Sequence, residues 1–282
     1  MKTKYFFPVL AFGGGAAAFV LRLLQNRTGF EAATGLPVPG NLWGILLAAL
    51  LAVTAVFNLL LTRKLPAGKG DAPSFESAFS SPSTGPVMVL VAGIFLLAAS
   101  GLLQAASSLG ILPDTMVLTA SGMVARAMFT SRLGLAEGVL TLLCAASLFT
   151  AVPVCRRSGS REAGGSASQA AINGNLLLVP VVVFVVRLVL SYREDSVNPA
   201  LAAYYVSLLA LVLMTLAFYR LASFAFQSGS SRCFLVYAVP AIVLCLASLA
   251  DGQPLYGALF YAGGAFTLSG FLLLHIDQPH MI

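Results

Sequence analysis

Charged residues are scarce in this sequence, and their scarcity is the strongest constraint on where the protein folds. Asp, Glu, Lys and Arg make up 9% of its 282 residues, whereas hydrophobic residues make up 59%. A soluble domain carries about 25% charged residues. With so few charges the chain cannot cover a surface that faces water, so we expect lipid to be its main solvent.

Histidine is almost absent and cysteine is sparse, which excludes several chemistries within a membrane. The two histidines, His275 and His280, both lie near the C-terminus. A haem held by two histidines inside a bundle, an HExxH zinc site and a histidine-based triad therefore lack their residues. The four cysteines form no close pair, which favours buried thiols over a disulfide or zinc framework. These cysteines are Cys144, Cys155, Cys233 and Cys245.

Signatures of nucleotide and nucleic-acid binding are also missing. The sequence contains no GxxxxGK[ST] loop and no GxGxxG after a strand. Its formal charge is +6, but the Lys and Arg residues sit at the ends of apolar runs instead of clustering on one face of a soluble domain. We therefore predict no cofactor, no metal site and no nucleic-acid partner; the lipid bilayer is the partner that the composition predicts.

Eight stretches approach the length of about 20 mostly apolar residues that a helix needs to cross the hydrocarbon core. No strand alternation is sustained enough to suggest a barrel. We therefore predict an all-α polytopic integral membrane bundle of about eight transmembrane helices. The predicted spans are residues 5–24, 42–62, 86–106, 134–154, 175–192, 200–221, 233–250 and 255–275.

The N-terminus has some features of a signal peptide, because Lys2 and Lys4 precede an apolar run that contains three consecutive alanines. The apolar run continues into the segment around Arg22, and a similar segment recurs around Arg187. A cleaved signal would not carry half of an internal repeat, so we expect a retained helix.

Lys and Arg residues are unevenly distributed between the two sides of this topology. With the N-terminus inside, ten lie on the cytoplasmic side, four lie in outer loops and two lie within outer helix ends. This asymmetry predicts the bacterial cytoplasmic membrane with both termini cytoplasmic. The cytoplasmic ten are Lys2, Lys4, Arg63, Lys64, Lys69, Arg156, Arg157, Arg161, Arg220 and Arg232, and the outer four are Arg27, Arg126, Arg132 and Arg193.

A short sequence pattern occurs twice and suggests an internal repeat. FVLRL at 19–23 resembles FVVRL at 184–188, and Ser74–Phe79 before the third span resembles 223–226 before the seventh. A small polar stretch at 156–173 divides the chain into four-helix halves at 1–155 and 174–282, and 63–85 resembles a second linker. An even helix number per half predicts parallel halves related by an axis along the membrane normal.

Two further segments have a structural interpretation. Residues 112–133 fit either a short helix in the outer interface or an ordinary ordered loop. Glycines at 13–15 in the first span, and Gly257, Gly263, Gly264 and Gly270 in the last, predict close contacts between helices.

Ionisable residues within the spans are the candidate site, because they are costly in lipid. Arg22 and Arg187 lie near outer helix ends with apolar neighbours on both sides. Each arginine either reaches the headgroups from below, or faces the bundle and pairs with a carboxylate. Glu137 and Asp251 are the natural partners for the second alternative, which we predict for Arg187 at least.

The most polar outer feature is the stretch 192–199, which contains Arg193, Glu194 and Asp195. Asn198 and Pro199 suit the start of a helix, so a tight turn explains much of this stretch. The alternative is a binding lip at the mouth of a cavity between the halves. Two adjacent carboxylates alone do not specify a metal. The candidate polar cluster, for substrate binding or for structure, is Arg22, Glu137, Arg187, Arg193, Glu194, Asp195 and Asp251.

The stretch YREDSVNPALAAYY at 192–205, the Phe-Ala-Phe segment at 224–226 and the order of eight helices resemble a group of multi-pass proteins from Gram-positive anaerobic bacteria. The resemblance covers most of the chain and is closest over 192–199 and the following helix. It implies the topology but no mechanism, since no activity is assigned to that group.

Two classes of function remain open. The first is a small permease, or a membrane subunit of a transport system, with an outward-facing polar site. The alternative is a non-transporting scaffold, sensor or assembly factor that contacts a membrane or cytoplasmic protein partner. A membrane enzyme ranks behind both, because histidine is scarce and the sequence shows no nucleophile–base set. A transporter needs a polar cavity near the midplane, and few charges occur there.

Overall fold

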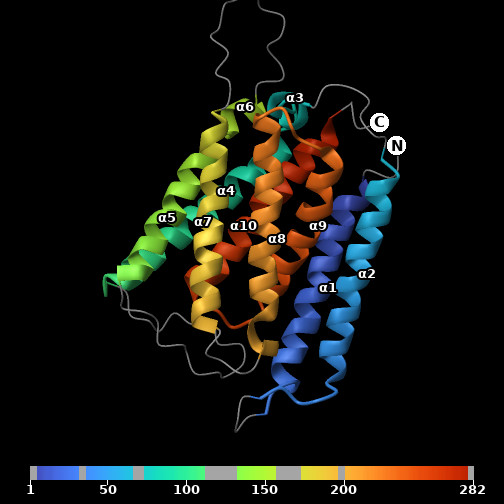
Figure 1. Cartoon of the computed structure of the whole chain (residues 1–282), viewed down its shortest axis with the longest axis vertical. Coiled ribbons are helices and arrows are strands. Elements are labelled where there is room, and N and C mark those ends of the chain that lie inside the picture. Colours follow the sequence, from blue (N-terminus) through green and yellow to red (C-terminus); the bar gives the residue numbers. More distant parts are fainter. Residues whose placement is uncertain are drawn as a thin grey trace, which may run out of the picture.

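The computed structural model describes residues 5–31, 36–65, 73–111, 132–156, 173–195 and 201–278, without the side chains of residues 132, 194, 195 and 201–203. These residues form helices and no β-strand, which confirms the predicted all-α class. The helices are α1 Phe6–Thr28, α2 Leu42–Arg63, α3 Phe75–Phe79, α4 Thr84–Ser108, α5 Arg132–Phe149, α6 Val152–Arg156, α7 Gly174–Asp195, α8 Leu201–Ala225, α9 Ser231–Ser248 and α10 Leu255–Asp277 (Figure 1).

Eight helical segments are long and apolar enough to cross a membrane, and the fourth of them comprises α5 and α6 together. The chain is therefore an integral membrane protein with several spans, as predicted. Successive spans alternate in direction, so α1 begins and α10 ends at the same end of the bundle, where α3 and α6 also lie (Figure 1). We call this the α3 end, and the other the opposite end.

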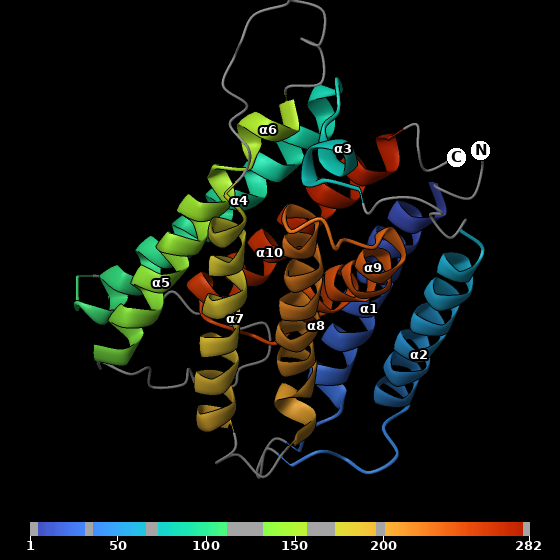
Figure 2. The same cartoon turned by 45° about the horizontal axis from the view of Figure 1, so that its top comes forward.

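Helix α10 forms the centre of the bundle. In the most apolar 18-residue stretch of α10, 72% of the residues are buried. The same share is 22% for α2, which lies at one flank beside α1 (Figure 2). α10 packs most closely along α4 because glycines let the two backbones approach. A Cβ atom added at Gly93 would lie 2.4 Å from the backbone nitrogen of Thr267, and one at Gly270 would lie 2.6 Å from the Cα of Leu90.

The predicted glycine surfaces differ in use. Gly264 and Gly15 each lie against a side chain of another helix. A Cβ added at Gly264 would lie 2.4 Å from the Met214 sulfur, and one added at Gly15 would lie 2.4 Å from a Leu246 methyl group. Gly13, in contrast, has nothing within 4 Å. The small residues of the last span therefore serve packing, whereas those of the first span do so only in part.

The prediction of a plain linker over 63–85 is wrong within its second half. Ser74 caps α3 by accepting a hydrogen bond from the Ser77 backbone amide at 3.3 Å. The side chain of Phe79 is completely buried and meets the rings of Phe224 and Phe234 at centroid distances of 5.1 and 5.5 Å. Burial of the phenylalanines docks this segment on the bundle, which a composition rich in Gly, Pro and Ser did not reveal.

Two helix boundaries also differ from the prediction. The fourth span breaks between α5 and α6, because Pro153 has no amide hydrogen to donate to the carbonyl of Phe149. Helix α7 continues to Asp195, beyond the predicted end at 192. Residues 192–195, the first half of the stretch where a tight turn was predicted, are therefore helical, and residues 196–200 lie outside the described residues.

The predicted halves make extensive contacts with each other. α1 packs on α9, α4 on α10 and α5 on α7. The two similar segments around Phe75 and Phe224 belong to different kinds of element, a separate helix and the last turn of α8. The repeat and the division into halves stay predictions, and residues 157–172 and 112–131 lie outside the described residues.

Candidate functional site

Both predicted arginines are buried at the opposite end of the bundle, and each faces the protein. Arg22 is completely buried and Arg187 is 6% exposed. Of the two alternatives that the sequence left open for them, the structure shows the inward-facing one. We call the two groups of side chains around these residues the Arg22 cluster and the Arg187 cluster.

The Arg22 cluster joins α1 to the turn between α9 and α10. The Nε of Arg22 donates to Oδ1 of Asp251 at 2.5 Å, and Nη1 donates to Oε1 of Gln25 at 3.0 Å. The guanidinium carbon lies 5.3 Å from the centre of the Tyr205 ring on α8. This positive charge is therefore matched by a carboxylate whose side chain is only 4% exposed.

The position of Asp251 is set by the turn that ends α9. Its backbone amide donates to the carbonyl of Ser248 at 3.1 Å. The next residue, Gly252, has a φ of 62°, a left-handed conformation that favours glycine. Asn26 on α1 donates to the Ala250 carbonyl at 2.8 Å and so holds the same turn against α1.

The Arg187 cluster joins α7 to α4 and α5. Nη1 of Arg187 donates to Oε1 of Gln104 at 3.1 Å, and Nε lies 3.7 Å from Oε1 of Glu137. Gln104 in turn donates to Oε2 of Glu137 at 2.6 Å. The amide of Gln104 therefore bridges the arginine and the carboxylate, which form a looser ion pair than Arg22 and Asp251.

Two further groups complete the Arg187 cluster. Thr141 lies one helical turn after Glu137, and its hydroxyl is 3.5 Å from Nη1 of Arg187. The guanidinium carbon of Arg187 is 3.8 Å from the centre of the Phe260 ring on α10, which is the geometry of a cation–π contact. The cluster thus connects four helices at one level of the bundle.

The remaining three predicted residues, Arg193, Glu194 and Asp195, lie at the end of α7. Arg193 is exposed at the end of α7. Glu194 and Asp195 form the last residues of that helix, and their side chains lie outside the described ones. Among the described side chains, four of the seven candidates form two pairs, Arg22 with Asp251 and Arg187 with Glu137.

Sequence reasoning missed Gln25, Gln104, Thr141 and Tyr205. Gln25 follows Arg22 by three positions and so shares its helix face, a signal that the sequence contained. Gln104 is a polar amide within an apolar span, but nothing in the sequence related it to an arginine 83 positions away. In the described part of the chain, no three His, Cys, Asp or Glu side chains are grouped to hold a metal ion.

Comparison with known proteins adds no relative. No protein-family model matches the chain, and no curated protein or solved structure matches it either. The resemblance to multi-pass proteins of Gram-positive anaerobic bacteria therefore stays a prediction. Any functional conclusion must come from the geometry of the chain itself.

Proposed function

We propose that this protein is a small permease or the membrane subunit of a transport system, and that the two arginine clusters close its outer end. The observation that carries the proposal is the Arg187–Glu137 pair, separated by 3.7 Å and bridged by Gln104 within the spanning bundle. Ionisable side chains inside a membrane commonly mark substrate or ion pathways.

The physical reason is that a buried ion pair does not by itself favour stability over an apolar contact. A pair held across separate helices can, however, open and close with those helices. The carboxylate of Glu137 is 16% exposed, and its arginine shares its donors between Gln104, Thr141 and the carboxylate. An anionic substrate could replace Glu137 on Arg187 without leaving the guanidinium unpaired.

We also propose a location for this function: the bacterial cytoplasmic membrane, with both termini and the α3 end on the cytoplasmic side. Among the described residues, Arg63, Lys64, Arg156, Arg220 and Arg232 lie at the α3 end, in keeping with the positive-inside rule. A cysteine introduced at Ser196 should react with a membrane-impermeant thiol reagent applied outside, whereas one at Ser166 should not. The reverse pattern would overturn the orientation.

Water access to the interior tests the permease proposal without knowledge of the substrate. Ser207 is 6% exposed and lies six residues into α8, about 9 Å along the axis. In a background with Cys233 replaced by serine, Ser207→Cys should react slowly with a charged thiol reagent from outside. Adding Glu137→Gln, which weakens the closing contact, should speed the reaction several-fold.

Two matched positions serve as controls for this measurement. Thr28→Cys, at the exposed end of α1, should react rapidly in both backgrounds, and Ser269→Cys, completely buried in α10, should react in neither. If Ser207→Cys stays unreactive with and without Glu137→Gln, no outer path opens and the permease proposal fails.

That failure would favour the second candidate, a non-transporting scaffold, sensor or assembly factor. The observation in its favour is the tight packing between α4 and its neighbours. A Cβ at Gly101 would lie 2.9 Å from the Gly138 carbonyl oxygen on α5, and one at Gly93 would meet the backbone of α10. Helices in such contact resist the relative movement that transport requires.

A further inference from the structure

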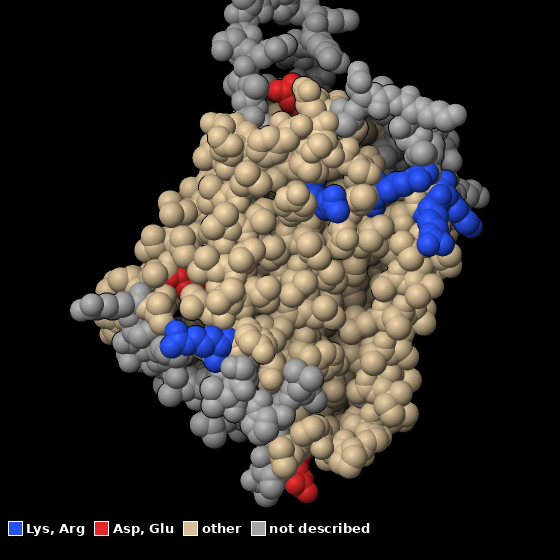
Figure 3. Space-filling view, viewed as in Figure 1, with Lys and Arg blue, Asp and Glu red and all other residues tan. Residues whose placement is uncertain are grey.

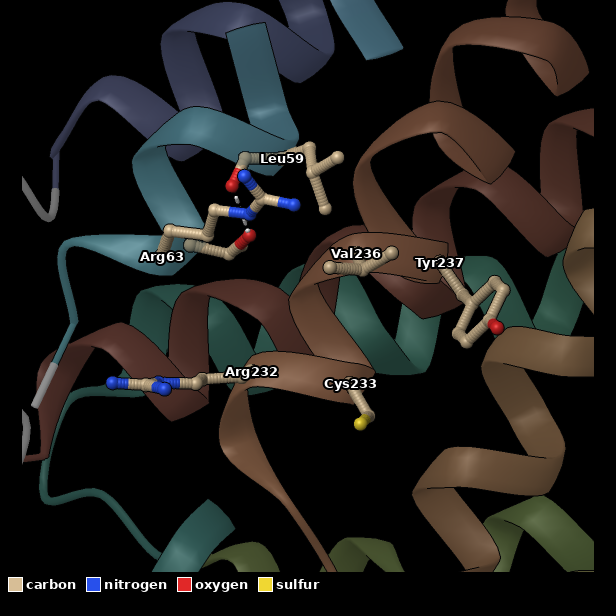
Figure 4. Close-up of a pocket in the computed structure, with 7 residues that line it drawn as sticks. Leu59, Arg63, Arg232, Cys233, Val236 and Tyr237 are labelled. Atoms are coloured by element: carbon tan, nitrogen blue, oxygen red, sulfur yellow. Dashed lines mark hydrogen bonds between the residues drawn. The ribbon is translucent and has the colours of Figure 1, made fainter. Parts of the chain in front are cut away.

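A groove between the end of α2 and the start of α9 lies at the α3 end, far from both arginine clusters. It forms an open hollow of about 190 Å³. Leu59 and Arg63 of α2 lie on one side, and Arg232, Cys233 and Val236 of α9 lie on the other (Figure 4). The groove therefore combines an apolar wall with two arginines at its rim.

Positive charge gathers around this groove. Arg63 ends α2 and Lys64 follows it, Arg232 is the second residue of α9, and Arg220 lies near the end of α8. Figure 3 shows Lys and Arg atoms grouped at the upper right of the molecule, where α2 ends in Figure 1. Within the described part of the chain none of these four residues forms an ion pair, in contrast to Arg22 and Arg187.

The arginines are positioned but incompletely bonded. One terminal nitrogen of Arg232 donates to the carbonyl of Leu65, two residues after the end of α2. Its Nε is buried and has no hydrogen-bond partner among the described residues, and the same holds for Nε of Arg220. These buried Nε atoms are closed to incoming groups, so an acceptor in the groove would bond to the terminal nitrogens of the guanidinium groups.

Tyr237 places a third arginine, Arg220, next to the groove. Its ring lines the groove, and the guanidinium carbon of Arg220 lies 5.7 Å from the ring centre. Arg220 is at the same distance from the ring of Tyr219. Such contacts hold the guanidinium near the groove while leaving hydrogen-bond donors for an anion.

The surface below the groove is apolar and faces lipid. Leu59, Leu60 and Val56 of α2 are 41%, 49% and 57% exposed, respectively. A soluble anion would use the arginines alone, whereas an anionic lipid would use both the arginines and this wall. Basic pockets between transmembrane helices on the cytoplasmic side are suited to lipid headgroups.

We propose that this groove binds an anionic phospholipid, with its phosphate at Arg63 and Arg232 and an acyl chain along Leu59 and Val236. Arg220 and Lys64 add positive charge near the phosphate. The ligand chemistry is a phosphate ester, and the apolar wall selects the lipid over free phosphate. The inference is independent of the permease proposal, because it concerns the other end of the bundle.

Binding to the purified full-length chain in detergent tests the inference by native mass spectrometry. Phosphatidylglycerol should be retained more strongly than phosphatidylcholine. Arg232→Gln should weaken that retention about tenfold, as expected for the loss of a charge-assisted hydrogen bond. Arg156→Gln removes the same charge at the same end but from an exposed site on α6, and should leave retention unchanged.

The native Cys233 gives a second measurement on the unmodified chain. It lines the groove and is half-buried, whereas the other three cysteines are buried. Phosphatidylglycerol should slow its reaction with a maleimide several-fold, and phosphatidylcholine should not. This measurement decides the question even if Arg232→Gln does not fold.

Three results would overturn the proposal. Equal losses in Arg232→Gln and Arg156→Gln would show general attraction of anionic lipid to a basic end. Equal retention of both lipids would remove the role of charge. Protection of Cys233 by millimolar inorganic phosphate, to the same extent as by lipid, would identify a site for a soluble anion instead.

Discussion

The Arg22 and Arg187 clusters start from nearly the same five residues, FVLRL and FVVRL, and differ in how the guanidinium is bonded. Arg22 has a direct bond of 2.5 Å to Asp251 and a second bond to Gln25 of its own helix. Arg187 lies 3.7 Å from Glu137 and bonds to Gln104 of another helix. Similar local sequence thus leads to similar burial but to different partners.

The difference shows that the local sequence sets the burial of such an arginine but not its partner. An arginine within an apolar helix must either reach the headgroups or find an anion, because lipid offers no hydrogen bonds. The partner is supplied by whichever helix or turn lies opposite: for Arg22 a turn held by Gly252 and Asn26, and for Arg187 two adjacent helices. The Arg22 cluster is accordingly the more closed of the two.

The largest expected effect separates the two arginines directly. Arg22→Ala leaves the buried carboxylate of Asp251 without its main counter-ion, so the free energy of unfolding should fall by about 3–5 kcal/mol. Arg187→Ala should cost less, because Glu137 keeps its bond to Gln104 and is 16% exposed. Unfolding in detergent measures both, with the exposed Arg27→Ala as control. Equal losses for the two variants would break the comparison.

Double-mutant cycles should then sharpen the comparison between the two clusters. We expect coupling of about 2–3 kcal/mol for Arg22→Ala with Asp251→Ala, and about 1 kcal/mol for Arg187→Ala with Glu137→Ala. Removing both partners should be milder than removing either alone, since no buried charge is left. Coupling in the Arg22 pair should change little between low and high salt, because buried pairs are weakly screened. Strict additivity in both cycles would show that neither ion pair contributes to stability.

A conservative substitution tests the geometry of the looser cluster. Arg187→Lys keeps the charge but loses the planar fork that reaches Gln104 and Glu137 together. Its stability should lie between the wild type and Arg187→Ala, about 1–2 kcal/mol above the alanine variant, in line with bonds to charged groups. A lysine variant as unstable as the alanine variant would show that shape, and not charge, is what the site requires.

The smallest expected effects concern one peripheral residue of each cluster, Asn26 and Thr141. Asn26→Ala removes a 2.8 Å bond to the Ala250 carbonyl and should cost about 1 kcal/mol. Thr141→Val removes a 3.5 Å contact to Arg187 and should cost about half as much or less. Thermal unfolding of the two variants side by side measures this. The reverse order would mean that the Arg187 cluster is the tighter one.

The charged residues of the candidate site were predictable from the sequence. The cost of an ionisable group in lipid singled out Arg22 and Arg187, and the small number of carboxylates near the same level left Asp251 and Glu137 as partners. Gln104 and Tyr205 were not predictable, because amides and tyrosines occur in many helices and their partners depend on packing. The buried α3 was also missed, since its burial depends on rings contributed by α8, α9 and α10.

By itself the sequence determined the solvent, the number of spans and the two costly arginines, because each follows from hydrophobicity summed along a single segment. The tertiary structure alone decided which helix lies inside. α2 is the more hydrophobic, with a mean hydropathy of 2.5 against 1.6 for α10, yet 22% of its most apolar 18-residue stretch is buried against 72% for α10. In lipid an apolar side chain gains little by leaving the bilayer, so close packing through glycines and bonds between polar groups selects the central helix.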